Sequence, residues 1–250
     1  MELRNATVLV TGGSSGIGLS IAKILVDAGA RVAITGRDET RLAQAARTLN
    51  ALPIRADVSD EADVLRTYQE VLRTFGHLDV LINNAGIQNR TRFADAAHDW
   101  ERTRQEIAIN LDAPLHLSAL FIPHLLAQQH PAIINVTSGL AFVPIASSPI
   151  YCATKAALHS FTLSLRHQLS GTPIQVVEIV PPAVNTDLGG AGLHTFGVPV
   201  DEFADAAMAG LRKGELEITY GFSAQASHAS RDELGAMFSR MNEVSRKSET

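Results

Sequence analysis

Short apolar runs alternate along this chain with longer segments in which apolar residues recur every three or four positions. Short runs bounded by turn residues are typical of buried strands, whereas the longer periodic segments are typical of helices with one buried face. Strands that alternate with helices form βαβ units around a parallel sheet. The expected strands cover residues 6–11, 31–35, 52–56, 78–82, 132–136, 174–180 and 216–219.

The segments between these strands carry the helical pattern, and right-handed crossovers place such helices on both faces of a sheet. The expected helices cover residues 17–28, 40–49, 60–75, 99–129, 151–169, 201–211 and 231–244. Asp60 is expected to cap its helix, and Pro114 and Pro123 to kink the long one. Residues 223–230 are expected to form a loop and residues 247–250 a frayed tail. No linker divides the chain, so residues 1–250 are predicted to form one domain: a doubly wound, mostly parallel, seven-stranded α/β sheet.

Composition agrees with this class and argues against others. Hydrophobic residues make up 46% of the chain and aromatic residues only 5%, so the core is mainly aliphatic, as in strands covered on both faces. A formal net charge of −5 argues against nucleic-acid binding, which needs a basic face. The single cysteine, Cys152, excludes an internal disulfide and is expected to be a small buried hydrophobe. No apolar run reaches the length of a membrane span, and a cytoplasmic location is the expectation.

A glycine-rich loop, TGGSSGIG at residues 11–18, joins the first strand to the first helix. The open N–H groups at a helix N-terminus bind phosphate, and glycines let the backbone approach a pyrophosphate. The spacing differs from the GxGxxG fingerprint, so a simple tight turn remains an alternative for this loop alone. The same residues fit GxSxG, in which Ser14 would be the nucleophile of an α/β-hydrolase. Only one strand precedes Ser14, and this early position disfavours the hydrolase.

Three further side chains suggest acid–base chemistry. Tyr151 and Lys155 lie four residues apart at the start of a helix and therefore share one face of it. Ser138 ends the fifth expected strand, at the edge where ligands bind in open parallel sheets. An ammonium about 5 Å from the phenol would stabilise the phenolate by roughly 3 kcal/mol, or about two pKa units. The pKa of Tyr151 is thus expected to fall toward neutrality, with Ser138 holding a substrate carbonyl.

Together these motifs resemble, in order and spacing, those of the short-chain dehydrogenase/reductase family along nearly the whole chain. The matching segments are TGGSSGIG at 11–18, Asp57 and Val58, NNAG at 83–86, Asn110, Ser138, Tyr151 with Lys155, and IVPPAVNT at 179–186. One departure is Pro182, which stands where the family usually has glycine and puts the backbone geometry there in doubt. Residues 189–199 are similar to bacterial members associated with D-alanine esterification genes, a likeness that implies no chemistry.

The resemblance implies an oxidoreductase that moves a hydride between a nicotinamide cofactor and a carbonyl or secondary alcohol. It implies four catalytic residues: Tyr151 as general acid or base, Lys155 lowering its pKa and binding the nicotinamide ribose, Ser138 orienting substrate, and Asn110 holding a water. The implied cofactor-binding residues are Gly12, Ser14, Ser15, Gly16, Ile17, Gly18, Arg37, Asp57, Val58, Asn84, Ala85, Gly86, Tyr151, Lys155, Pro181, Val184 and Thr186. The helices at 99–129 and 151–169 resemble the family's dimer interface, so a homodimer or homotetramer is expected.

The end of the second strand indicates which cofactor is preferred. Enzymes that use NAD usually place an acid there to bind the ribose, and those that use NADP an arginine nearby. Gly36 occupies the acid's position, Arg37 follows it, and Asp38 comes one or two positions too late. NADP(H) is therefore the predicted cofactor, with NAD(H) as the weaker alternative. The bland alternative for Arg37 is a solvated loop cation.

The substrate is the least constrained part of the prediction. Apolar or glycine-rich residues at 140–145 and 189–199 flank the expected site, which suggests an apolar carbonyl or alcohol beneath a mobile lid at 187–200. His194 and Phe196 are expected either to contact the substrate from the lid or simply to pack in the loop. Nine histidines show no metal-ligand spacing, so no catalytic metal is expected, and Trp100 is expected to pack. A non-catalytic, cofactor-binding sensor on the same fold and the hydrolase remain alternatives.

Overall fold

A computed structural model of the chain describes residues 3–94 and 98–247, and its centre is one seven-stranded sheet. The strands are β1 (Thr7–Val10), β2 (Arg31–Gly36), β3 (Leu52–Arg55), β4 (Val80–Asn83), β5 (Ala132–Val136), β6 (Gln175–Val180) and β7 (Glu217–Thr219). They lie in the order β3-β2-β1-β4-β5-β6-β7, and every neighbouring pair is parallel. The predicted doubly wound α/β fold is therefore confirmed.

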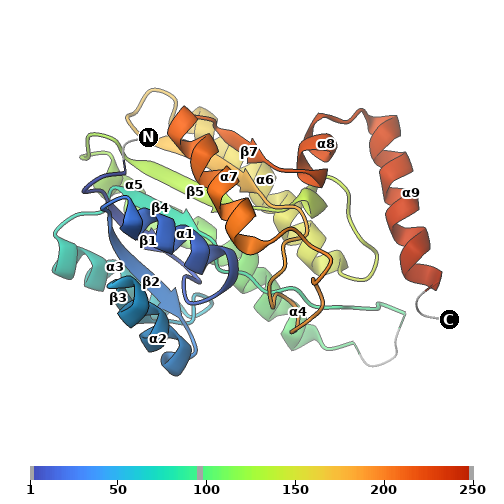
Figure 1. The fold of residues 1–250 in the computed structure, drawn as a ribbon, viewed down its shortest axis with the longest axis horizontal. Helices are drawn as coiled ribbons and strands as arrows, with labels where there is room; N and C mark the ends of the chain where they lie inside the picture. Colours follow the sequence, from blue (N-terminus) through green and yellow to red (C-terminus); the bar gives the residue numbers. More distant parts are fainter. Residues whose placement is uncertain (1–2, 95–97, 248–250) are drawn as a thin grey trace.

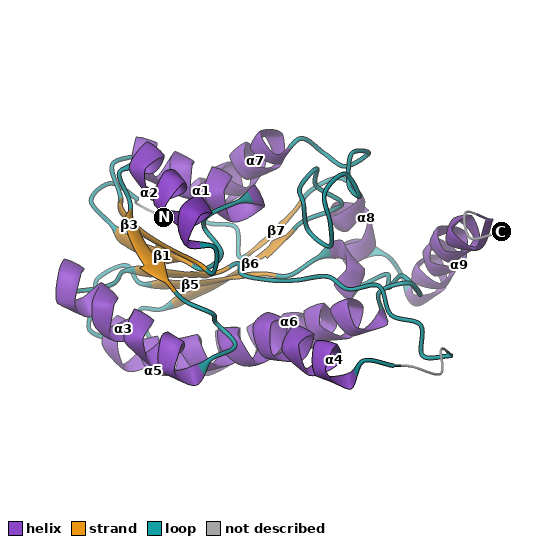
Figure 2. Cartoon of the chain, turned by 90° about the horizontal axis from the view of Figure 1, so that it is seen from below, coloured by secondary structure: helices purple, strands orange, loops and turns teal. Residues whose placement is uncertain are grey.

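Helices cover both faces of the sheet (Figure 2). One layer holds α1 (Gly16–Asp27), α2 (Glu39–Leu49) and α7 (Val200–Lys213). The other holds α3 (Glu61–Phe75), α4 (Trp100–Ile107), α5 (Ala113–Leu125) and α6 (Pro149–Gln168). Because successive strand side chains point to opposite faces, Val8 and Val10 of β1 pack in the first layer's core and Leu9 in the second's. The aliphatic composition fills two apolar layers in this way.

Aspartates begin three of these helices, as expected of residues whose carboxylate accepts a bond from an open backbone N–H. Asp60 accepts from the N–H of Asp63 at 3.0 Å, which confirms the predicted cap of α3. Asp38 caps α2 and Asp99 caps α4 in the same way. The carboxylate of Asp38 therefore caps α2.

The long helix predicted over residues 99–129 is interrupted and shorter. It consists of α4, a π-helical segment at Ala108–Asp112, and α5, which ends at Leu125. Pro114 is the second residue of α5, directly after the π-helical segment, and has no N–H to donate within this continuous helical run. Pro123 lies in the last turn of α5. The widened π-helical turn, a feature often found at functional sites, was not predicted and holds Asn110.

The C-terminal part corrects two predictions. Residues 223–230, predicted to form a loop, are mostly helical in α8 (Phe222–His228), where the buried Ser223 hydroxyl donates to the carbonyl of Val180 at 2.5 Å. Beyond it α9 (Arg231–Lys247) stands out from the body of the molecule (Figure 1). Lys247, predicted to be frayed, is the last residue of α9, and the rest of that predicted tail lies outside the described residues.

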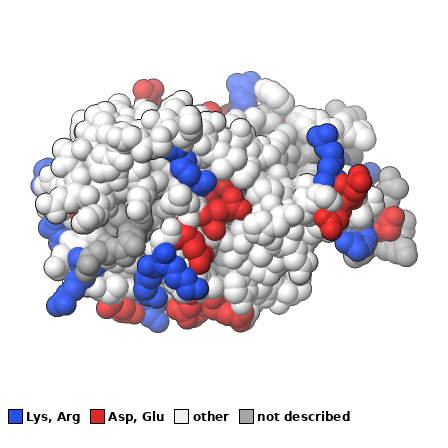
Figure 3. Space-filling view, turned by 90° about the horizontal axis from the view of Figure 1, so that it is seen from above, with Lys and Arg blue, Asp and Glu red and all other residues white. Residues whose placement is uncertain are grey.

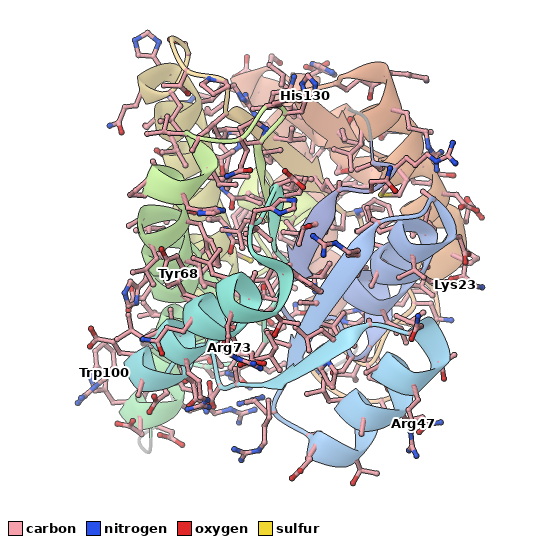
Figure 4. All side chains as sticks on the ribbon, turned by 90° about the vertical axis from the view of Figure 1, so that its left-hand side faces the viewer. Lys23, Arg47, Tyr68, Arg73, Trp100 and His130 are labelled. Atoms are coloured by element: carbon pink, nitrogen blue, oxygen red, sulfur yellow. The ribbon has the colours of Figure 1, made fainter. Side chains whose placement is uncertain are left out.

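Aromatic side chains lie both at the surface and in the core. Trp100, predicted to pack, begins α4 at the edge of the molecule (Figure 4) and is 53% exposed, with its ring tilted against that of His98 at 6.0 Å. Tyr68 of α3 packs edge-on against Phe121 of α5, with 4.9 Å between ring centroids.

Acidic and basic side chains are interspersed among uncharged ones on the face drawn in Figure 3. None of the helices described is long and apolar enough to cross a bilayer.

Candidate active site

A cavity of about 990 Å³ opens at the carboxyl ends of the strands. β1 pairs with both β2 and β4, so the loops that follow these strands diverge, and ligands bind at such a switch point in open α/β sheets. The predicted site residues that line the cavity are Gly12, Ser14, Ser15, Gly16, Ile17, Arg37, Asp57, Val58, Asn84, Ala85, Gly86, Ser138, Tyr151, Lys155, Pro181, Val184 and Thr186. Two others, Gly18 and Asn110, lie behind its wall.

The glycine loop presents the start of α1 to this cavity. Ser15 occupies the N-cap without a side-chain hydrogen bond to the helix, so the first-turn N–H groups are left for a ligand. Gly12 has a φ of +64°, and a Cβ there would lie 2.9 Å from the Cα of Ala85. Side chains are thus excluded where the backbone lies closest to the cavity. In the part of the chain described, Ser14 has no hydrogen bond to a histidine, as a hydrolase nucleophile would require.

Gly18 and Thr11 build the wall behind the loop. A Cβ on Gly18 would overlap the Nδ2 atom of Asn84, which donates to the carbonyl of Thr11 at 2.8 Å. The Thr11 hydroxyl accepts from the N–H groups of Asn84 and Ala85 at 2.9 and 3.0 Å. Gly18 therefore allows α1 to approach Asn84, directly after β4, closely, and it does not line the cavity. Thr11 was not predicted as a site residue, although it is the first letter of the motif TGGSSGIG.

Tyr151 and Lys155 lie side by side in the first two turns of α6. Only 5% of Tyr151 and 4% of Lys155 is exposed, and Nζ of Lys155 lies 5.7 Å from the centroid of the tyrosine ring. The ammonium donates to the carbonyl of Val136, at the end of β5, at 2.8 Å. Ser138 begins a 3-10 turn, Gly139–Ala141, in which its Oγ accepts from the N–H of Leu140 at 3.1 Å. The fold therefore brings all three predicted side chains to one end of the cavity.

The electrostatics of this group correct one prediction. Burial raises the pKa of Tyr151 above its usual 10, and the hydrogen bond with Ser138 lowers it only in part. Burial also lowers the pKa of Lys155 to about 8. The expected fall in the pKa of Tyr151 neglected the desolvation of both groups, which in this interior outweighs their attraction. In the chain without ligand Tyr151 is a neutral phenol, and therefore a proton donor.

Asn110 of the π-helical turn reaches the site indirectly. Its Oδ1 accepts from the N–H of Ile87 at 2.9 Å, while its Nδ2 donates to the carbonyl of Ile87 at 2.8 Å and to Thr154 at 3.2 Å. Both amide ends thus fasten the chain that follows β4. A Cβ on Gly86 would lie 3.4 Å from Oδ1 of Asn110 and 3.7 Å from Nζ of Lys155. The missing side chain of Gly86 therefore leaves a small space bordered by both groups.

The end of β2 holds Arg37, the cation that is predicted to select the cofactor. A Cβ on Gly36 would lie 2.7 Å from Oγ of Ser14, so that position accepts no larger residue without rearrangement. Arg37 lines the cavity, half exposed, with its guanidinium 3.7 Å from the carboxylate of Asp57. Arg41, one turn into α2, also lines the cavity and was not predicted. The sequence feature that could have indicated Arg41 is its position four residues after Arg37.

The other end of the cavity is mostly apolar. Its walls include Leu140, Ile145, Leu188, Phe196, Phe222 and Met241, with His194 among them. His194 and Phe196 therefore both face the cavity, as the predicted lid contacts should, and both ring nitrogens of His194 are buried without a partner. Phe222 of α8 and Met241 of α9 also line the cavity and were not predicted as site residues. Pro182 also lines the cavity.

Cys152 was also the subject of a prediction. Cys152 is a free, buried thiol whose Sγ lies 3.4 Å from the N–H of Ile145, and burial raises its pKa, as expected of a small buried hydrophobe. Among residues 3–94 and 98–247, no cluster of three or more His, Cys, Asp or Glu side chains is arranged to hold a metal ion.

Comparison with known proteins identifies the family. Residues 6–193 match the short chain dehydrogenase family. The chain belongs to this family. The uncharacterized oxidoreductase DltE of Bacillus subtilis is 44% identical over 248 residues, which cover 97% of this chain and 98% of DltE. A probable NADP-dependent dehydrogenase of Haemophilus influenzae is 35% identical over 183 residues, 72% of this chain and 71% of that protein.

Solved structures of the family share the fold. A 3-ketoacyl-(acyl-carrier-protein) reductase from Brucella melitensis complexed with NADH has a TM-score of 0.81 at 29% identity, covering 88% of this chain and 99% of that chain. A short-chain dehydrogenase from Sphingobium yanoikuyae in complex with NADPH has a TM-score of 0.80 at 28% identity, covering 96% and 95%. This chain is therefore a member of an oxidoreductase family in which solved relatives hold NADH or NADPH.

Proposed function

We propose that this protein is an NADP(H)-dependent oxidoreductase that interconverts an apolar carbonyl compound and the corresponding alcohol. The observation that carries the proposal is the position of Tyr151, Lys155 and Ser138 in one cavity with the open N-terminus of α1. A cavity of about 990 Å³ lies at the upper end of the range for small-molecule sites, which leaves room for a cofactor and a substrate together.

The residues present fit a dinucleotide. The α1 N-terminus and the side-chain-free backbone at Gly12 suit a pyrophosphate, and Asp57 with Val58 would border the adenine. The residues proposed for the nicotinamide half are Asn84, Ala85, Gly86, Lys155, Pro181, Val184 and Thr186. When bound, the cofactor supplies or accepts the hydride; the protein binds and orients both reactants and handles the proton.

Tyr151 is proposed to give its phenolic proton to the carbonyl oxygen as charge develops there, or to take it back in the reverse direction. The Ser138 hydroxyl, already bonded to Tyr151, would hold that oxygen in place. Lys155 would replenish the proton, and the space left by Gly86 would hold a water between Lys155 and Asn110. The raised pKa of Tyr151 supports the proton-donating direction, carbonyl reduction, for the neutral phenol.

The substrate proposal rests on the apolar end of the cavity. Its carbon side chains favour an apolar group next to the carbonyl, and residues 187–200 would close over it as a lid. We expect oxidation of NADPH, followed by its absorbance, with apolar ketones or aldehydes as substrates. Turnover of charged carbonyls alone would reject the apolar substrate class. Failure with every carbonyl and alcohol tested, although NADPH binds, would favour the non-catalytic sensor, and ester cleavage without cofactor would favour the hydrolase.

Arg37 is proposed to select NADP(H) by pairing with the phosphate that distinguishes it from NAD(H). A hydrogen bond to a charged group is worth about 1.5–3 kcal/mol, so Arg37→Ala should raise the Kd for NADPH roughly 10- to 100-fold and change that for NADH little. Titration of intrinsic or cofactor fluorescence measures both constants. The matched control is Arg47→Ala, because Arg47 lies on the exposed side of α2, the helix that follows Arg37 (Figure 4). An equal loss for both cofactors would contradict the assignment.

We also propose a homo-oligomer, a dimer or tetramer, formed through α4, α5 and α6. Leu126, just beyond α5, and Leu163 of α6 are large apolar side chains exposed at 44% and 43%, as expected of a surface that a second copy covers.

A further inference from the structure

A buried pair of ionisable side chains lies directly behind the candidate active site. Glu178 of β6 is 0% exposed, and Nδ1 of His159 lies 2.9 and 3.0 Å from its two carboxylate oxygens. The hydroxyl of Thr137 donates to the Oε1 atom of the same carboxylate at 2.6 Å. A buried carboxylate is costly unless it is paired and hydrogen-bonded. Here both of its oxygens are engaged by two side chains from two different elements.

This cluster holds the chain on both sides of Ser138. Thr137 immediately precedes Ser138, and its backbone N–H also donates to the carbonyl of Ile179 at 2.9 Å. On the other side, the ring of Phe142 packs edge-on against His159 with 4.8 Å between centroids. The 3-10 turn that contains Leu140 lies between these two anchors. The segment that carries the Ser138 hydroxyl is therefore tied at both ends to the His159–Glu178 pair.

His159 also connects this cluster to α6, the helix that carries Tyr151 and Lys155. Tyr151, Lys155 and His159 follow one another at intervals of four residues on α6, so they share one face of the helix. Tyr151 and Lys155 face the cavity, while His159 reaches past them to β6. The distance between α6 and the Ser138 turn is thus set partly by a bonded chain of three side chains.

We propose that Thr137, Glu178 and His159 are positioning residues that hold Ser138 in register with Tyr151. Glu178 and His159 lie outside the lining of the cavity, whereas Thr137 is part of it. The inference rests on the proposed function for what Ser138 and Tyr151 do, but the alignment itself is a property of the fold. A misplacement of about 1 Å at a reacting centre can cost about 100-fold in rate, so the effect should appear in kcat.

The charge of His159 makes this alignment depend on pH. The hydrogen bond to Glu178 raises the pKa of His159 above its usual 6.5; burial opposes this rise, and the charge of Glu217 adds to it while that of Arg166 reduces it. A group whose pKa is raised on folding stabilises the fold fully below its unfolded value, and this stabilisation is lost as pH rises through the folded value. The contacts that hold Ser138 should therefore weaken as pH rises through the raised pKa of His159.

The test compares Thr137→Val, which keeps the shape but removes the donor, with Thr137→Ser, which restores it. Thr137→Val and Glu178→Gln should lower kcat roughly 10- to 100-fold with little change in the Kd for NADPH, and Thr137→Ser should keep most of the activity. Hydrogen exchange at the Leu140 amide, which donates to Ser138, should be faster in Thr137→Val and in His159→Gln. In His159→Gln the fall of kcat that follows the deprotonation of His159 should disappear. His167→Gln, an exposed histidine two turns further along α6, is the matched control.

The outcomes separate this inference from the proposed function. Unchanged kcat and unchanged Leu140 exchange in Thr137→Val and His159→Gln would overturn the positioning role. A pH profile of His159→Gln that matches the wild type after scaling would do the same. If Glu178→Gln or Thr137→Val fails to fold, hydrogen exchange at the Leu140 amide in His159→Gln decides whether the positioning role holds. Should the wild type turn over no substrate, the proposed function fails alone, because the exchange measurement still tests the alignment.

Discussion

Replacing Tyr151 with Phe should lower kcat by about 100- to 10,000-fold, the usual contribution of a general acid or base. The phenyl ring keeps the packing of the buried tyrosine beside Lys155, so only the proton and its hydrogen bond with Ser138 are lost. The Kd for NADPH should change less than about fivefold, since a single uncharged hydrogen bond is worth about 1 kcal/mol. Steady-state rates and a fluorescence titration measure the two quantities.

A second tyrosine provides the control for this experiment. Tyr68 lies on α3, where its ring packs against Phe121 rather than lining the cavity (Figure 4). Tyr68→Phe should retain wild-type kcat. Turnover of Tyr151→Phe within a few fold of the wild type would remove the proton donor from the account, whereas loss of NADPH binding would mean that the variant has disturbed the cavity.

Replacing Lys155 with Met should abolish most turnover and at the same time stabilise the protein without cofactor. The pKa of Lys155 falls from 10.5 to about 8 through burial, a difference of 2.5 units, which corresponds to roughly 3 kcal/mol of unfavourable free energy at neutral pH. Methionine avoids this cost but leaves the carbonyl of Val136 without its donor, at about 1–3 kcal/mol. The expected net gain in the free energy of unfolding is therefore between about 0 and 2 kcal/mol at pH 7.

The sign of the pH dependence distinguishes this explanation from a general improvement in packing. Between pH 8 and 10.5 the unfolded chain still holds the proton on Lys155 while the folded chain has released it. The unfolded state then binds more protons, so the stability of the wild type rises with pH in this range. The stability gap between Lys155→Met and the wild type should therefore shrink, and reverse, as pH rises toward 10.

Urea unfolding of both proteins at several pH values measures this gap. Because both proteins contain Tyr151 and Cys152, the contributions of these side chains to the pH dependence cancel in the difference. Lys23→Met, on the exposed side of α1 (Figure 4), is the matched control and should show no such pH dependence. A gap that stays constant from pH 7 to 10 would mean that Lys155 is not buried as a charged group, and would contradict the site described.

The fold was predictable because its strands are continuous apolar runs and its helices have strong periodicity. The core strand β5 was predicted at the bounds the structure gives. Two features were not predictable in this way. The π-helical turn at Ala108–Asp112 conserves helical periodicity on both sides, so the pattern shows no break. The sequence SAQASHAS has the small polar residues of a loop, yet Ser223 and Ala226 are buried and anchor α8.

The candidate site was predictable where a motif is short and local, as for Tyr151 with Lys155 and for the glycine loop. It was not predictable where the property depends on burial. The spacing of Tyr151 and Lys155 gave their proximity, but the direction of their pKa shifts follows from desolvation that only the packed structure reveals. Glu178 did carry a signal: it is the one charged residue in the buried strand QVVEIV, and such a residue needs a partner.

The central claim is that this chain aligns a carbonyl for direct hydride transfer and protonates its oxygen from Tyr151. Its most direct test uses NADPH that carries deuterium at both positions of the transferring carbon of the nicotinamide, with mass spectrometry of the alcohol formed. The account predicts one deuterium at the carbinol carbon with the wild type, and almost no product in the same time with Tyr151→Phe. Alcohol formed without deuterium at that carbon, or formed equally fast by the variant, would contradict it.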